Sequence, residues 1–292
     1  MSAAPVRAPG AVPAPPRLAR LTITVRGLID GWNRLGNQTA FYAKALVLTW
    51  DAIARYTAET LRLIANMSLG IGALAIIGGT VVVVTTLVMS TGSFVGIQLY
   101  RSLSDIGVEA LSGFASAYIN TRFAAPLTAA IGLAATIGAG ATAQMGAMRI
   151  NEEIDALEVM GIRAISYLAS TRIVAGVLVT VPLWCLSSLA GYLATRTLVV
   201  VAFGQAAGVY DHYFQTYLQP TDLIWSLVQI IVTATVVMLV HTYYGFNATG
   251  GPAGVGEAVG RSVRASLIVA VTVQLAVAMA AYGVSGNFNL SG

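Results

Sequence analysis

The sequence predicts an all-α protein that crosses a membrane five times, and three observations lead to this fold class. Hydrophobic residues make up 57% of the 292 residues and charged residues only 10%, whereas a soluble domain has about 25% charged residues. Five segments contain no Asp, Glu, Lys or Arg, and each is long enough to cross a membrane as a helix, which takes about 20 residues. These segments are 63–89, 123–148, 173–195, 223–244 and 265–284.

The third observation is that positive charge is concentrated before the first uncharged segment. Short basic flanks stay on the cytoplasmic side of a membrane, so this asymmetry predicts a cytoplasmic N-terminus. Five crossings then place the C-terminus on the opposite side. The basic residues that precede the first segment are Arg7, Arg17, Arg20, Arg26, Arg34, Lys44, Arg55 and Arg62.

The residues before the first segment form two parts. Residues 1–26 are rich in Pro, Ala and Arg and lack the pattern of a cleaved signal peptide, so we expect a disordered cytoplasmic tail. Residues 27–62 alternate apolar and polar side chains at helical spacing but are too charged to cross a membrane. They predict an amphipathic helix at the membrane interface, where aromatic and basic side chains are both favoured. A soluble helical hairpin is the alternative.

The stretch MRINEEIDALEVMGI, residues 148–162, is acidic in an otherwise apolar chain and falls on the cytoplasmic side in this topology. On a helix, Ile150, Ile154 and Leu157 share one face. An anionic membrane surface repels the carboxylates, so we expect a short helix that docks its apolar face on a protein partner. Packing on this chain's own termini is the alternative. The carboxylates are Glu152, Glu153, Asp155 and Glu158.

The second segment contains two series of small residues, and within each series a small residue recurs every four positions. Such spacing lets a neighbouring helix approach closely within a membrane. We therefore expect helix contacts along one or both series, which are Gly132, Thr136 and Gly140, and Gly138, Thr142 and Gly146.

Residues that could carry chemistry are few. Lys44 is the only lysine and no glycine-rich phosphate loop surrounds it, which excludes an ATPase site of the Walker type. His212 and His241 are far apart and have no acidic or thiol cluster at ligand spacing, so no metal site is expected. We place His241 near the inner end of the fourth segment. Cys185 is the only cysteine, and we identify no catalytic residue.

The run QMGAMRINEEIDALEVMGIRAISYLASTRIVAG, residues 144–176, resembles the signature of the MlaE/YrbE permease family. The resemblance is strongest to the YrbE-type permeases of actinobacterial Mce lipid transporters and extends from about residue 27 to the fifth segment. APLTAAIGLAATIGAG at 125–140 and GFNATGGPAGVGEAVGRSVR at 245–264 also match the pattern of this family.

The resemblance implies a non-catalytic permease subunit of a Mce-type ABC lipid transporter in the bacterial inner membrane. The N-terminus would be cytoplasmic and the C-terminus periplasmic, and a hydrophobic lipid would be moved, we expect by import. This chain would bind no cofactor, because ATP and Mg would be held by a separate ATPase subunit. The acidic helix would be the coupling helix seated on that ATPase, with contacts at Glu152, Glu153, Asp155, Leu157 and Glu158.

Further partners implied by the resemblance are a second YrbE-type permease and periplasmic Mce proteins. Many members of the family carry arginine and glutamate where this chain has Thr136 and Gln144. A related but different permease could supply those charges, which favours a heterodimer.

Charged and polar side chains between the first and second segments are expected to line the outer mouth of a lipid path, because charge near a membrane tends to face a cavity or a partner. Arg122 would then be available to an anionic head group. An ordinary external loop is the alternative. The six candidates are Gln98, Arg101, Glu109, Tyr118, Asn120 and Arg122.

Two other functions are weighed against the permease. An ion-coupled secondary transporter would show interrupted helices in corresponding places of two halves, with charges near the middle of the membrane. A membrane-embedded lipid enzyme would show a nucleophile or general base grouped with a charge. Both signals are weak in this sequence.

Overall fold

The fold comes from a computed structural model that describes residues 32–33, 35–69 and 80–283. Within these ranges the chain is helical and contains no strand, which confirms the predicted all-α class. Five helices there are long and apolar enough to cross a membrane, as the uncharged segments predicted. They are Val81–Ser104, Glu109–Ile150, Ile165–Ala202, Pro220–Phe246 and Gly251–Tyr282.

The first span lies later in the chain than predicted. The predicted segment 63–89 covers the end of α3 (Thr57–Leu69), residues 70–79, which lie outside the described part, and only the start of α5 (Thr80–Ser104). The uncharged run continues past residue 89 to Tyr100, and Arg101 lies in the last turn of α5, so the helix extends beyond the predicted end. A basic side chain there can extend to the membrane surface and interacts favourably with the helix C-terminus.

The second span is a single long helix built from several segments. It begins with the 3₁₀ turn η1 (Glu109–Leu111) and contains two π-helical segments. At 42 residues it would extend ~63 Å, about twice the hydrocarbon thickness of a membrane. Part of it therefore projects beyond the membrane. Its remaining segments are α6 (Ser112–Ile119), η2 (Asn120–Ala124), α7 (Ala125–Leu133), η3 (Ala134–Gly138) and α8 (Ala139–Ile150).

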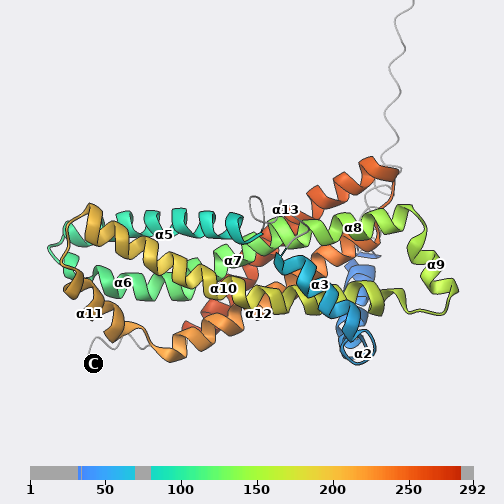
Figure 1. The fold of residues 1–292 in the computed structure, drawn as a ribbon, viewed down its shortest axis with the longest axis horizontal. Coiled ribbons are helices and arrows are strands. Elements are labelled where there is room, and N and C mark those ends of the chain that lie inside the picture. Colours follow the sequence, from blue (N-terminus) through green and yellow to red (C-terminus); the bar gives the residue numbers. More distant parts are fainter. Residues whose placement is uncertain (1–31, 34, 70–79, 284–292) are drawn as a thin grey trace, which may run out of the picture. The chain divides into compact units, whose positions relative to one another are not determined.

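The third span contains two further π-helical segments, one at each end. The first, η4 (Ile165–Ser170), leads into α10 (Thr171–Thr197), and the second is η5 (Leu198–Ala202). Wide π turns are rare and frequently lie at functional sites. The fourth and fifth spans, α12 (Pro220–Phe246) and α13 (Gly251–Tyr282), are joined by a short turn. α12 packs against α8, α10 and α13 (Figure 1).

The connection between the third and fourth spans is folded, a feature not predicted from the sequence. It holds α11 (Ala207–Tyr217), which packs on α6. The buried Tyr210 hydroxyl donates to Ser116 Oγ at 2.8 Å, and burial raises the pKa of Tyr210 to about 12. Both carboxylate oxygens of Asp211 accept from Arg196 at 2.7 Å, which holds the pKa of Asp211 below its ordinary value. These contacts fasten α11 to the spans.

One of the two predicted series of small residues closes the contact between α8, α12 and α13. A Cβ atom added at Gly138 would lie 2.6 Å from Nε2 of His241, and one added at Gly146 would lie 2.9 Å from Cγ1 of Val255. The series of Gly138, Thr142 and Gly146 is therefore confirmed as a packing face.

The other series packs closely at Gly132 and is open at Gly140. A Cβ atom at Gly132 would collide with a methyl group of Val84, whereas one at Gly140 would meet no atom within 4 Å.

A buried histidine holds these three helices together by polar contacts. His241 lies near the end of α12, as predicted, and is 0% exposed. Its Nδ1 is 2.9 Å from Thr142 Oγ1 on α8, and its Nε2 is 3.0 Å from Ser266 Oγ on α13. Thr142 Oγ1 is also 3.1 Å from Ser262 Oγ. Polar contacts of this kind between helices are a recognised source of association within membranes.

The N-terminal part of the chain is helical in shorter pieces. Residues 1–43 and 44–292 form two compact units, and residues 35–47 are helical. In the second unit, α2 (Thr49–Arg55) and α3 pack on α10, and α2 also contacts η4. The predicted interfacial segment 27–62 is thus divided into several helices. The predicted tail, 1–26, lies outside the described residues, as do residues 284–292.

Candidate functional site

The acidic stretch forms a short helix, α9 (Glu153–Val159), between the second and third spans. Glu152 precedes it with φ of 60°, and Gly161 follows it with φ of 78°. Both values lie in the left-handed region, which is unusual for a residue other than glycine. The chain therefore leaves the second span, makes two turns of helix and reverses into the third span (Figure 1).

The apolar face of α9 is directed toward the chain itself. Ile154 is 0% exposed and Leu157 is half-buried, and α9 packs against α8. Ile154 is therefore covered within this chain, whereas contact of Leu157 and the carboxylates with a partner stays a prediction. The alternative of packing on the chain termini concerns residues 1–31 and 284–292, which lie outside the described part. The surface left for a partner is the charged one.

Two apolar residues extend that surface, and sequence reasoning missed them. Val159 is 90% exposed and Met160 is 66% exposed, directly after the carboxylates. Both lie outside the apolar face formed by Ile150, Ile154 and Leu157, so the helical periodicity of apolar residues does not indicate them. Their length and position at the end of α9 make them an apolar knob beside an acidic face.

The acidic face keeps most of its charge. Arg149 Nη1 pairs with Asp155 Oδ1 at 2.6 Å, which neutralises one carboxylate. Glu153 Oε1 accepts only a long bond of 3.5 Å from Asn151 Nδ2, and no cation of the described residues pairs with Glu152, Glu153 or Glu158. Three exposed carboxylates therefore present uncompensated negative charge, which is suited to a basic partner surface.

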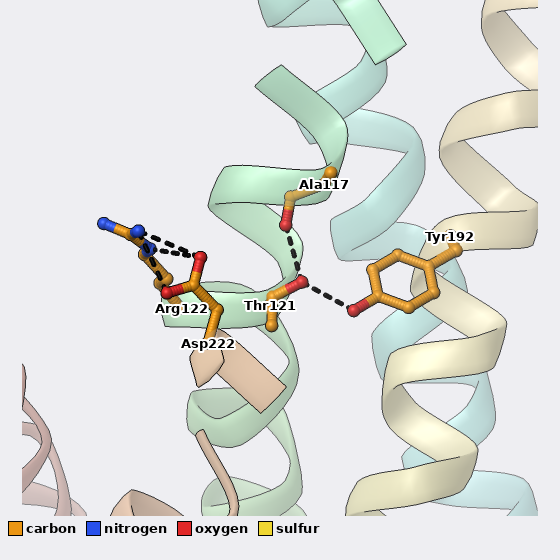
Figure 2. A network of polar contacts seen from close by, with 5 residues as sticks. All are labelled: Ala117, Thr121, Arg122, Tyr192 and Asp222. Atoms are coloured by element: carbon orange, nitrogen blue, oxygen red, sulfur yellow. Dashed lines mark hydrogen bonds and ion pairs between the residues drawn. The ribbon is translucent and has the colours of Figure 1, made fainter. Parts of the chain in front are cut away.

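A second polar cluster joins the second, fourth and fifth spans, and Figure 2 shows its pair of Arg122 and Asp222. Arg122 of η2 binds Asp222 of α12 through Nε and Nη2, at distances of 2.9 to 3.0 Å to both carboxylate oxygens. Only 16% and 11% of these side chains are exposed. The guanidinium carbon also lies 4.0 Å from the ring centroid of Tyr118 and 4.4 Å from that of Tyr282. Two-point pairing and contact with aromatic rings are the arrangements in which arginine binds most strongly.

The neighbouring residues of η2 link it to the third span. The hydroxyl oxygen of Tyr192 lies 2.6 Å from Thr121 Oγ1, and Thr121 Oγ1 donates to the carbonyl oxygen of Ala117 (Figure 2). Asn120 Nδ2 donates to Thr195 Oγ1 at 3.0 Å, and its side chain is buried. The π turn at η2 thus aims Asn120 and Thr121 at α10 and Arg122 at α12.

The six residues predicted to line a lipid path lie in different surroundings. Asn120 is 1% exposed and Arg122 is neutralised by Asp222, so neither is open to a ligand in this conformation. Gln98 and Arg101 are exposed near the end of α5, and Glu109 and Tyr118 are half-buried on the second span. Asp222 was missed because it lies 100 residues from Arg122 in the sequence. No group of three or more His, Cys, Asp or Glu side chains suited to a metal occurs among the described residues.

Comparison with known proteins gives a family assignment. The Permease MlaE family matches residues 70–280. The chain is 26% identical over 182 residues to Protein TRIGALACTOSYLDIACYLGLYCEROL 1, chloroplastic, of Arabidopsis thaliana, which covers 61% of this chain and 52% of that protein. Probable ABC transporter permease proteins of Rickettsia bellii and Synechocystis sp. are each 28% identical, over 188 and 182 residues, covering 61% of this chain and 69% of each protein.

The chain therefore spans about half the length of the Arabidopsis relative and about two thirds of the two bacterial ones. The family match itself runs from residue 70 into α13 and includes α9 and the Arg122–Asp222 pair. Since it covers well over half of the sequence, this multi-pass membrane protein belongs to the MlaE permease family.

Proposed function

We propose that this chain is the non-catalytic permease subunit of an ABC lipid transporter and that α9 is its contact with a separate ATPase subunit. The observation that carries the proposal is the exposed acidic face of α9, held between two membrane spans of a MlaE-family chain. The names of the bacterial relatives, probable ABC transporter permease proteins, support it. ATP and Mg would be bound by the ATPase and not by this chain.

The proposed docking surface consists of three unpaired carboxylates and the apolar knob. Glu152, Glu153 and Glu158 would face basic residues of the ATPase, while Val159 and Met160 would enter an apolar pocket. Asp155 would act mainly through its pair with Arg149, and the half-buried Leu157 would hold α9 in place together with Ile154. Closure of the ATPase would then displace α9 and the helices attached to it as rigid elements.

Charge reversal on α9 tests this proposal. Glu153→Arg with Glu158→Arg leaves the internal Arg149–Asp155 pair intact, and both side chains are exposed. We expect at least about a tenfold weaker recovery of the ATPase on purification in mild detergent, because like charges face each other across the interface. Asp105→Arg, on an exposed turn between the first two spans, is the matched control. Equal recovery of the ATPase with both variants would contradict the proposal.

We also propose that a second, related permease covers the open face of the second span. Thr136 is half-buried, Gly140 has open space beside it, and Gln144 and Ala147 are exposed. Small residues on one helical face permit close approach of another helix within a membrane. The resemblance to YrbE-type permeases favours a partner of different sequence that supplies the charges absent at Thr136 and Gln144. Purification with a tag on this chain alone should recover both permeases, whereas recovery of this chain as its own dimer would contradict the heterodimer.

The Mce type, import as the direction, the bacterial inner membrane and the orientation of the chain are proposed from the same resemblance. Gln98, Arg101, Glu109 and Tyr118 remain the candidates for the outer end of a lipid path, with Asn120 and Arg122 positioning the helices around it. With Cys185 replaced by Ser, a membrane-impermeant thiol reagent should label Asp105→Cys from outside the cell but not Val159→Cys. The opposite labelling pattern would overturn the orientation.

A further inference from the structure

We infer that α2 and α3 form a strut that receives the displacement of α9 through the start of the third span, with Asp51 as its positioning residue. The strut is defined as residues 45–69, and the junction as residues 163–172, which follow α9 and open the third span. This inference rests on the proposed function, because it concerns where the motion received by α9 goes. It adds a second route besides the spans themselves.

The link between α9 and the junction is fixed by backbone hydrogen bonds. Gly161 N–H donates to the carbonyl of Glu158 at 3.0 Å, and Ile162 N–H donates to the carbonyl of Leu157 at 3.0 Å. With Gly161 in the left-handed conformation, this pair of bonds is the Schellman arrangement that closes a helix. Ala164, only 2% exposed, follows directly. Displacement of α9 is therefore passed to the junction and is not absorbed by a loose loop.

Asp51 of α2 holds the junction through one carboxylate. Its Oδ2 accepts from Ser166 Oγ at 3.2 Å and lies 3.7 Å from Nη1 of Arg163. Its Oδ1 pairs with Arg55 Nε within α2 at 2.8 Å. The Asp51 side chain is only 17% exposed, so these interactions are less screened than those of a surface carboxylate. The same carboxylate also lies at the N-terminal end of the third span, where negative charge is favourable.

Further contacts hold the strut to the junction on both sides of Asp51. The rings of Tyr56 and Tyr167 meet edge to face at 5.1 Å between centroids. Ser170 Oγ, fully buried, donates to the carbonyl of Ala45 at 2.8 Å.

A buried cation lies under α3 at the end of the junction. Arg172 is 6% exposed and donates through Nη1 to the carbonyl of Leu168, while its Nε has no hydrogen-bond partner. Glu59 of α3 supplies the opposite charge nearby. The strut thus contacts the junction from Arg163 to Ser170.

The outer face of the strut suits a membrane surface. Val47 and Trp50 are 77% and 79% exposed, and the side chain of Arg55 is 70% exposed. Aromatic and aliphatic side chains next to a basic one are typical of helices that lie in the headgroup layer. Motion of the junction would accordingly move a segment in contact with lipid.

Amide hydrogen exchange on the complete transporter in lipid nanodiscs tests the inference. Exchange is compared without nucleotide and with ATP, Mg and vanadate, which trap the closed ATPase. We expect nucleotide to alter exchange in residues 153–162 and, in parallel, in residues 45–60. In Asp51→Ala the response of 45–60 should fall by about fivefold, a typical size for coupling between sites. The response of 153–162 and the recovery of the ATPase should stay unchanged.

Arg55→Ala is the matched control, because it removes the local partner of Asp51 but leaves the bond to Ser166. It should respond like the unmodified protein. Ser166→Ala removes the same bond from the other side and should reproduce Asp51→Ala, so the test does not depend on one variant folding. An unchanged response of 45–60 in both Asp51→Ala and Ser166→Ala would overturn the strut while the ATPase contact stands. Absence of the ATPase from the unmodified preparation would overturn both proposals.

Discussion

Gly138 offers a sharp test of how closely the helices of this chain approach one another. A Cβ atom there would lie 2.6 Å from Nε2 and 2.8 Å from Cγ of His241, whose ring is fully buried and bonded at both nitrogens. We expect Gly138→Ala to cost about 1–3 kcal/mol in overpacking and about 1 kcal/mol for a displaced hydrogen bond to Ser266. Alanine stabilises a helix by about 0.5–1 kcal/mol relative to glycine, which offsets part of this cost. The net loss should be about 2 kcal/mol.

The measurement is the free energy of unfolding by SDS in mixed micelles with a mild detergent. Gly140→Ala, two residues along the same helix, is the control because its Cβ would meet no atom within 4 Å, and it should be neutral or slightly stabilising. Gly138→Ala should cost less in a His241→Ala background than in the unmodified protein, since the ring that obstructs the new methyl group is then absent. Equal stabilities of Gly138→Ala and Gly140→Ala would refute the packing described for α8, α12 and α13.

Three further predictions concern the polar pairs and the open face of the second span. Asp222→Asn leaves Arg122 without a counter-charge in a largely buried position and should lower the unfolding free energy by about 2–4 kcal/mol. Arg196→Gln at the more exposed pair should lower it by much less, and equal losses would contradict this difference. Because the pKa of Asp211 is lowered by Arg196, the stability contributed by that pair should persist above pH ~4 and be lost as the pH falls through the folded pKa, and Asp211→Asn should abolish this dependence in thermal unfolding. Gly140→Leu should prevent pairing with a second permease on size-exclusion chromatography while the unfolding free energy stays unchanged, and retention of the pair would count against the proposed interface.

The membrane spans were predictable because each depends on a continuous property of one segment. A run of uncharged residues is sufficient to indicate a span, and the concentration of carboxylates at 152–158 was sufficient to indicate a separate short helix. The limits of the first span were not predictable from charge alone. Arg101 is tolerated at the end of α5, so the helix continues beyond the last uncharged residue.

The contacts between distant segments could not be predicted because they depend on which faces meet. Arg122 and Asp222 are 100 residues apart, and nothing in either segment indicates the other. The two series of small residues have the same spacing, yet one packs against His241 and Val255 while the other is open at Gly140. Ile154 has the same apolar character whether it faces a partner or this chain, and only the position of α8 decides between them.

Photo-crosslinking from Val159 tests the role of α9 most directly. A benzophenone amino acid placed at Val159, which is 90% exposed, should crosslink to the ATPase subunit in intact cells and give a product of the summed mass. The same amino acid at Ile106, 71% exposed on the turn between the first two spans, should give no such product. An ATPase crosslink from Ile106, or none from Val159, would contradict the assignment of α9 as the site where this permease meets its ATPase.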